Sequence, residues 1–306
     1  MFPHSISIPG VTASTAKAII AKILSANGIT RTDLALSCGV SAMTAGKIVS
    51  AMRDVGYATV GEEFSARGRR SEFIYPAECF TFLIFDVGER AMYADVYDAR
   101  ENLKFTYTQP RNESVDFATD VASFVALVNE QLSDIGSPDA YRLSALLCRD
   151  QNMSIPPESI ELVTERAFAA ASYVKDAYPN ECIAFVGAND GADISVISDG
   201  KLLLGKTTPK NRAAKHVASE LEMLDTLTGK LAGLFELLIP DRVIIDSRSL
   251  HISRRFSSEF SERLTARTGM QKEELPELTT NDGIPFPSRA VIGQLIKLYA
   301  ELISAK

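Results

Sequence analysis

The sequence predicts a mixed α/β protein with a small helical module at its N-terminus and a larger body that repeats one strand pattern. The first 76 residues hold three helix patterns followed by a strand pair, and two later stretches about a hundred residues apart share one order of strands and turns. A length of 306 residues is the size of about two domains. With 46% apolar and 23% charged residues, the composition excludes a disordered or fibrous chain.

The N-terminal module begins with three predicted helices. Apolar residues recur at helical spacing over 16–24, before the stop signal Asn27-Gly28. Thr30 is a predicted N-cap of a short second helix, and a glycine-containing turn follows at 38–40. Ser41 then caps a third helix that ends at Gly56. Helix, short helix, turn and helix is the order of a helix-turn-helix motif.

The third helix has small and polar residues on the face opposite its apolar positions. These residues are Ala42, Met43, Gly46, Lys47 and Ser50. A recognition helix needs short side chains in its first turns, because these turns enter the DNA major groove and contact base edges. Lys47 would reach a phosphate or a guanine, and the hydroxyls of Ser41 or Thr44 would donate to the DNA backbone. An ordinary solvated surface helix is the alternative.

A basic hairpin is predicted directly after this helix. Two short strands at 57–60 and 72–75 flank the segment 65–70, which contains Arg67, Arg69 and Arg70. Arginines at such a tip favour DNA phosphates or a narrow minor groove, so the hairpin is predicted to be the wing of a winged helix. An exposed basic loop without this role is the alternative.

Charge and composition limit the kind of protein further. Residues 1–75 carry eight Lys or Arg and five Asp or Glu, a net charge of +3, so the rest must carry −10 of the total of −7. A small basic module on an acidic body is typical of a nucleic-acid binder with a separate sensing or dimerising domain. No apolar run is long enough for a membrane span, and no Lys or Arg precedes Lys17 to start a signal peptide. Scattered cysteines and histidines predict a reduced, cytoplasmic protein without a metal site.

The body repeats a strand–turn–strand–turn–strand pattern. The first copy covers 81–107 and the second 182–204, and helical segments follow each of them. Helices are predicted at 117–132, 213–238 and 289–302, and 242–246 has the apolar composition of a buried parallel strand. This repetition predicts a duplicated α/β architecture.

Residues 29–35 and 39–56 resemble the winged helix of ROK-type repressors (repressor, open reading frame, kinase). Gly68-Arg69-Arg70 is similar to the Gly-Arg-Pro at the end of that family's wing, with Arg70 in place of proline. The resemblance implies that the body has the two-lobed hexokinase/actin-like (ribonuclease H-like) fold that ROK proteins place after the winged helix. Segments 85–88, 165–171 and 239–245 are similar to its first phosphate loop, its base-bearing helix start and the strand before its adenosine site.

The sequence departs from the family's kinases at the catalytic positions. Arg166 stands where the resemblance places the Asp general base, and an arginine cannot accept a proton near neutral pH. Glu165, one position earlier, would point about 100° away on a helix. Asp86 is expected either to cap a plain turn or to be a remnant contact to a hydroxyl or a metal.

The loops that would hold phosphate also differ. Glu89 and Arg90 interrupt the first loop, and Asp190 and Asp193 add negative charge to the second. Asp246-Ser247 replaces the adenosine Gly-Gly. The family's cysteine-rich zinc motif is absent, and His216, the nearest histidine, is predicted to be structural. We therefore expect no catalytic residues, no cofactor and no metal.

The combined expectation is a sequence-specific transcriptional regulator, a repressor, with a catalytically inactive sugar-kinase-like body. The expected domains are 1–76 for the winged helix-turn-helix and 77–306 for the body, whose lobes are 77–178 with the C-terminal helix and 179–288. The expected partners are a double-stranded DNA operator, a second copy or a dimer of dimers, and a small-molecule effector of unknown identity, with no membrane. The alternative is an active or divergent ATP-dependent carbohydrate kinase of the ROK family. The expected DNA contacts are Arg31, Ser41, Ala42, Met43, Thr44, Gly46, Lys47, Arg67, Arg69 and Arg70.

Overall fold

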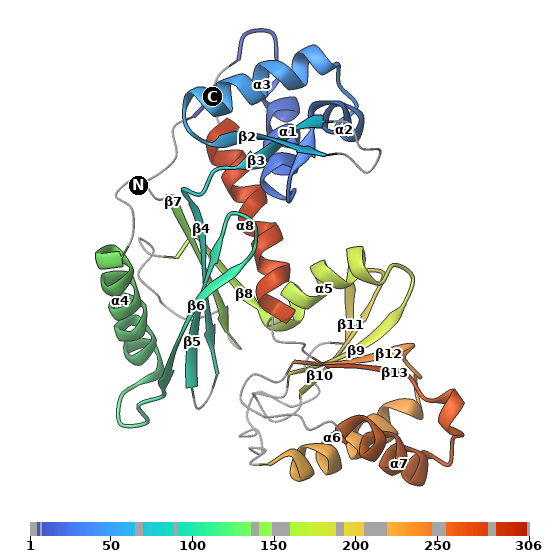
Figure 1. The fold of residues 1–306 in the computed structure, drawn as a ribbon. Coiled ribbons are helices and arrows are strands. Elements are labelled where there is room, and N and C mark those ends of the chain that lie inside the picture. Colours follow the sequence, from blue (N-terminus) through green and yellow to red (C-terminus); the bar gives the residue numbers. More distant parts are fainter. Residues whose placement is uncertain are drawn as a thin grey trace.

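Three β-sheets organise the part of the chain that the structure describes (Figure 1). The structure is a computed structural model. It describes residues 5–6, 8–64, 70–88, 91–135, 141–148, 160–187, 193–204, 219–246, 255–280 and 286–304. One three-stranded sheet belongs to the N-terminal unit, and two five-stranded sheets with their helices make up the rest. The protein is a mixed α/β structure, as the sequence predicts.

The N-terminal unit has the order helix, strand, helix, helix, strand, strand. Its elements are α1 (Ala13–Leu24), β1 (Ile29–Thr30), α2 (Arg31–Ser37), α3 (Ala42–Asp54), β2 (Ala58–Phe64) and β3 (Arg70–Pro76). Thr12, Thr30 and Ser41 cap the three helices, and each side chain accepts a hydrogen bond from the backbone N–H three residues later. The three predicted helices are confirmed, and the two strands are longer than predicted. The sequence does not predict β1, because two residues are too few for an alternating pattern.

The two larger sheets have the same strand order. In the first, β4 lies between the antiparallel pair β5 and β6 and the parallel pair β7 and β8. In the second, β9 has the place of β4, with β10 and β11 antiparallel on one side and β12 and β13 parallel on the other. The bounds are β4 (Phe80–Val87), β5 (Ala91–Asp98), β6 (Leu103–Pro110), β7 (Tyr141–Cys148), β8 (Leu162–Glu165), β9 (Cys182–Gly187), β10 (Asp193–Ser198), β11 (Lys201–Leu204), β12 (Arg242–Asp246) and β13 (Glu277–Thr280).

Helices cover both faces of each of these sheets. Along β4, Leu83 and Phe85 face α4 (Phe117–Ile135), whereas Phe82 and Ile84 belong to the core on the other face, which contains α8 (Phe286–Ser304). The second sheet packs on α6 (Glu220–Phe235) and α7 (Phe256–Thr268) on one face and on α5 (Arg166–Ala177) on the other. Figure 1 shows α6 and α7 side by side beneath this sheet. Because both faces are buried, the central strands are almost continuously apolar.

Two helices differ from the sequence prediction. The helix predicted over 213–238 is observed as α6, which Ser219 caps. Residues 213–218 lie outside the described part of the chain. The sequence pattern does not predict α7, whose buried residues are Phe256, Phe260 and Leu264. Among the described residues, no single helix is both long enough and apolar enough to cross a membrane.

Helix α8 joins the N-terminal unit to the body. It packs against α1, against β4 and β7 of the first sheet, and against α5 (Figure 1). One continuous hydrophobic core runs from α1 and α3 through the first sheet to α8. At its centre the ring of Phe80 lies 5.4 Å from that of Tyr57 and 5.0 Å from that of Tyr299. The module predicted as a separate domain therefore shares its core with the body.

The segment between the module and the body is packed as well. The sequence predicts Ala77-Glu78 as a minimal linker, but Ala77 is buried and its N–H donates to the carbonyl of Tyr57. The carbonyl of Cys79 accepts from the N–H of Tyr141, at the start of β7. These bonds place the end of β3 directly at the start of the first sheet.

We expect Tyr299 to be one of the most costly positions to alter in this core. Its hydroxyl donates to the carbonyl of Tyr141 at 2.7 Å, and burial raises the pKa of Tyr299 well above its usual value, so the donor proton is kept. Tyr299→Phe should lower the free energy of unfolding by about 1–2 kcal/mol, and Tyr299→Ala by about 3–5 kcal/mol. Urea unfolding measures both. Leu237→Ala, at a side chain that is 87% exposed, is the control and should change stability by less than about 0.5 kcal/mol.

Candidate functional site

Helices α2 and α3 meet at a sharp angle. Their axes differ in direction by 113°, and four residues, 38–41, separate them. Gly39 has φ +64°, a conformation that glycine adopts without strain, and the N–H of Val40 donates to the carbonyl of Ala35. The turn is therefore held by backbone bonds and directs α3 away from α2.

The start of α3 is fixed by two hydroxyl groups. The Ser41 side chain accepts from the backbone N–H of Thr44 at 3.1 Å, and the two side-chain oxygens lie 2.9 Å apart. Both residues were candidates for DNA backbone contacts. Their hydroxyls cap the helix here, and Ser41 is exposed while Thr44 is half-buried.

The two faces of α3 separate as the sequence predicts. Ala45, Ile48, Val49 and Met52 are buried. Ala42, Met43, Lys47 and Ser50 are exposed, and the Met43 side chain is 75% exposed. An apolar side chain this exposed, one turn before an exposed lysine, gives the N-terminal half of α3 a surface suited to contacts with a partner.

Arg31 connects α2, α3 and the hairpin. A Cβ at Gly46 would lie 3.7 Å from Cδ of Arg31, an ordinary contact distance, so the arginine side chain lies beside α3 at this glycine. The Arg31 guanidinium lies 3.6 Å from a carboxylate oxygen of Glu72 in β3, and both side chains are about half exposed. Sequence reasoning selected Arg31 but missed this ion pair, which holds the guanidinium beside α3.

The hairpin that follows is long and regular. Strands β2 and β3 pair antiparallel from Ala58 opposite Pro76 to Phe64 opposite Arg70. Of the three predicted wing arginines, Arg67 and Arg69 lie outside the described residues, and only the backbone of Arg70 is described. Residues 65–69, which follow β2 in the sequence, lie outside the described part of the chain.

A buried ion pair joins Asp86 to Arg166, two residues at positions where the family resemblance would place active-site groups of a kinase. Asp86, the next-to-last residue of β4, is 1% exposed, and Arg166, the first residue of α5, is 8% exposed. Nε of Arg166 donates to Oδ1 of Asp86 at 2.8 Å, and Nη2 donates to the same oxygen. Asp86 thus binds a guanidinium. The signal for this contact was the departure at Arg166, since an arginine is a complementary partner for the retained Asp86.

The remaining kinase-like positions are only partly described. Asp246, at the end of β12, is fully buried and lies in register with Gly187 of β9. Glu89, Arg90, Asp190, Ser247 and His216 lie outside the described residues, as do the side chains of Glu165 and Asp193. Within the described ranges, no group of three His, Cys, Asp or Glu side chains is arranged to hold a metal ion.

The whole chain resembles a solved regulator in its fold. The structure aligns with a crystal structure of a ROK family transcriptional regulator, a homologue of the E. coli MLC protein, over 95% of this chain and 98% of that one, with a TM-score of 0.60 and 13% identity. This chain shares the fold of that ROK regulator. The resemblance expected from the sequence is confirmed at the level of the fold.

Two further solved structures align with part of the chain. An inorganic polyphosphate/ATP-glucomannokinase from Arthrobacter sp. strain KM covers 71% of this chain and 98% of its own length, with a TM-score of 0.48 and 15% identity. A ROK family protein from Streptococcus pneumoniae TIGR4 in complex with sucrose covers 71% and 99%, with a TM-score of 0.46 and 12% identity. With both TM-scores below 0.5, neither likeness bears on the activity of this chain. No protein-family model and no curated protein matches the sequence.

Breaking the Asp86–Arg166 pair from one side should be costly. Arg166→Met leaves a buried carboxylate without its guanidinium, and we expect a loss of about 3–5 kcal/mol in unfolding free energy at pH 7.5. Urea unfolding at pH 7.5 measures this loss.

Asp86→Asn/Arg166→Met is the matched control for this pair. It removes both charges, so it should be more stable than Arg166→Met at pH 7.5. Urea unfolding at that pH measures both variants. Equal stability of the single and double variants would contradict the ion pair.

Proposed function

We propose that this protein is a sequence-specific DNA-binding transcriptional regulator, a repressor, whose N-terminal module contacts an operator duplex. The observation that carries the proposal is the α2–α3 pair with its exposed N-terminal half of α3, followed directly by the β2–β3 hairpin. The likeness in fold to a ROK regulator over nearly the full chain supports the same conclusion. The proposed domains are 1–76 for DNA binding and 77–306 for the body.

The geometry of the helix pair suits a helix-turn-helix. Such motifs cross at roughly 90–120° through a turn of about three or four residues that often contains glycine. The angle of 113° and the turn containing Gly39 fall within this range. With its apolar face buried against α1 and α2, α3 is free to enter a major groove about 12 Å wide with Ala42, Met43 and Lys47 leading.

The exposed residues have distinct proposed roles on DNA. The thioether side chain of Met43 is suited to a thymine methyl group, and Lys47 to guanine or to a phosphate. Arg31 is held beside Gly46 by Glu72, so it is positioned for the phosphate backbone at the edge of the same groove. Arg67, Arg69 and Arg70 are proposed to reach phosphates or the minor groove from the hairpin.

The body is proposed to be a duplicated, two-lobed domain of the hexokinase/actin type. The shared order of strands in the two large sheets supports this, as does the alternation of helices on their faces. We assign the first lobe to 77–178 with α8 and the second to 179–288. The body would provide the contacts of a homodimer, since two modules on half-sites about 34 Å apart bind DNA more specifically than one.

The body is proposed not to transfer phosphate. Asp86 and Arg166 neutralise each other in a buried contact, and Arg166 cannot act as a general base. An active ROK-type carbohydrate kinase is the alternative. Calorimetry with ATP and Mg²⁺ should give no binding at micromolar nucleotide, and coupled assays with hexoses should give no turnover. Micromolar ATP binding would overturn the inactive-body assignment.

The DNA proposal is tested by selecting bound sequences from random duplexes and then altering Lys47. If Lys47 contacts a base, Lys47→Ala should weaken binding to the selected site by about 1–3 kcal/mol and weaken binding to random DNA much less. Fluorescence anisotropy on both duplexes measures this difference. Lys272→Ala, an exposed lysine in the short helix of residues 272–274 beyond α7, is the control and should bind like the unaltered protein. Failure of the unaltered protein to enrich any sequence would contradict the proposed function.

A further inference from the structure

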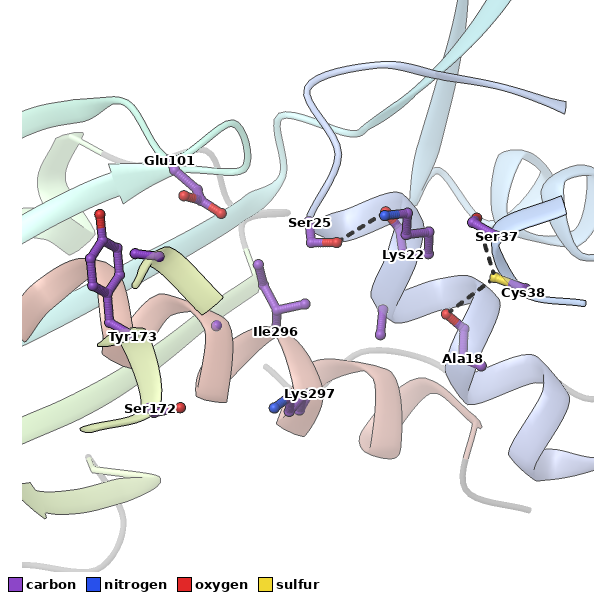
Figure 2. A pocket seen from close by; sticks show the side chains of 13 residues that line it. Ala18, Lys22, Ser25, Ser37, Cys38, Glu101, Ser172, Tyr173, Ile296 and Lys297 are labelled. Atoms are coloured by element: carbon purple, nitrogen blue, oxygen red, sulfur yellow. Dashed lines mark hydrogen bonds between the residues drawn. The ribbon is translucent and has the colours of Figure 1, made fainter. Parts of the chain in front are cut away.

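A cavity of about 750 Å³ lies where the N-terminal module meets the body (Figure 2). Its lining comes from α1, from the end of α2, from the β5–β6 turn, from α5 and from α8. Elements of the module and of the body therefore share one space. Such a volume falls in the range of small-molecule sites.

Part of the cavity lining is apolar, and several of these residues are small. Ile296 of α8, 2% exposed, lines the cavity, as do Ala18 and Ala21 of α1. Gly293 of α8 also lines the cavity, and a Cβ added there would meet no atom within 4 Å. Small side chains on helices that otherwise pack closely leave this space open.

The polar part of the lining has an excess of positive charge. Lys22 of α1 and Lys297 of α8 both line the cavity, and within the described residues neither amino group has an ion-pair or hydrogen-bond partner. By contrast, Lys17 and Glu301 on the same two helices form an ion pair with each other. Glu101 is the one carboxylate among the described lining residues. Two ammonium groups and one carboxylate leave the described lining with a net charge of +1, which favours an anion.

Hydroxyl groups complete the lining. Ser25 lies at the end of α1, and Ser172 and Tyr173 lie on α5 (Figure 2). Together with Lys22 and Lys297, they add hydrogen-bond donors to a lining that is otherwise largely apolar. This combination suits a molecule with an apolar or aromatic body and an anionic head.

We propose that the cavity binds a small organic anion, with its carboxylate, phosphate or sulfonate between Lys22 and Lys297 and its apolar part against Ile296. The ligand would touch α1 on one side and α5 and α8 on the other. A ligand that bridges the module and the body changes the affinity for DNA by the same factor by which DNA changes the affinity for the ligand. This regulatory part rests on the proposed function, whereas binding of the anion does not.

The binding test uses two fluorescent probes that differ in one group. The anionic probe is 8-anilinonaphthalene-1-sulfonate, and the neutral probe is N-phenyl-1-naphthylamine, which has the same ring system without the sulfonate. The full chain should bind the anionic probe at least about tenfold more tightly than the neutral one. Lys22→Gln/Lys297→Gln should weaken binding of the anionic probe by about five- to tenfold and leave the affinity for the neutral probe unchanged.

A second variant fills the cavity instead of changing its charge. Gly293→Phe should abolish binding of both probes at this site. Gly233→Phe is the matched control, because Gly233 is also an exposed helical glycine with no atom within 4 Å of an added Cβ, but it lies on α6. If Gly293→Phe and the double lysine variant both bind the anionic probe like the unaltered protein, the proposed site is wrong.

The regulatory part is measured separately. Saturating anionic probe should shift the affinity for the selected DNA site by at least about threefold, and Gly293→Phe should remove the shift. No shift in a protein that binds both the probe and DNA overturns the regulatory part. A protein that binds the probe but no DNA keeps the site and overturns the proposed function.

Discussion

The burial of α8 between the module and the body is the interaction on which the rest of the structure depends. Its residues Leu295, Ile296 and Tyr299 lie in a core that also contains α1, α3 and the first sheet. The same helix contacts α5, which packs on the second sheet. Helix α8 therefore contacts the first sheet, the module and the helix that packs on the second sheet.

The exposed face of α3 and the Asp86–Arg166 pair have different surroundings in this arrangement. The exposed half of α3 lies at the far end of the module and is held only through its apolar face, so its outer residues are free to contact a partner. Asp86 and Arg166 lie where β4 and α5 approach each other inside the body. A guanidinium there satisfies a carboxylate that would otherwise need a metal or substrate to offset its burial.

Much of the N-terminal unit could be predicted from sequence because its signals are local. Thr30 and Ser41 are caps that act over three residues, and Ile48, Val49 and Met52 follow a helical period. The contacts that sequence reasoning missed are distant along the chain. Arg166 is 80 residues from Asp86, and Lys297 is on the opposite end of the sequence from Lys22. Periodicity carries no information on such pairs, and α7 was missed because it has few buried apolar residues, namely Phe256, Phe260 and Leu264.

The position of α8 in the sequence also bears on how the protein is made. The module is synthesised first, but the apolar face of α1 finds its partner only after residues 286–304 have left the ribosome. Domains usually fold in the order in which they emerge. Here the nascent module keeps part of its core uncovered until α8 has been synthesised, so the N-terminal unit completes its packing only together with the body.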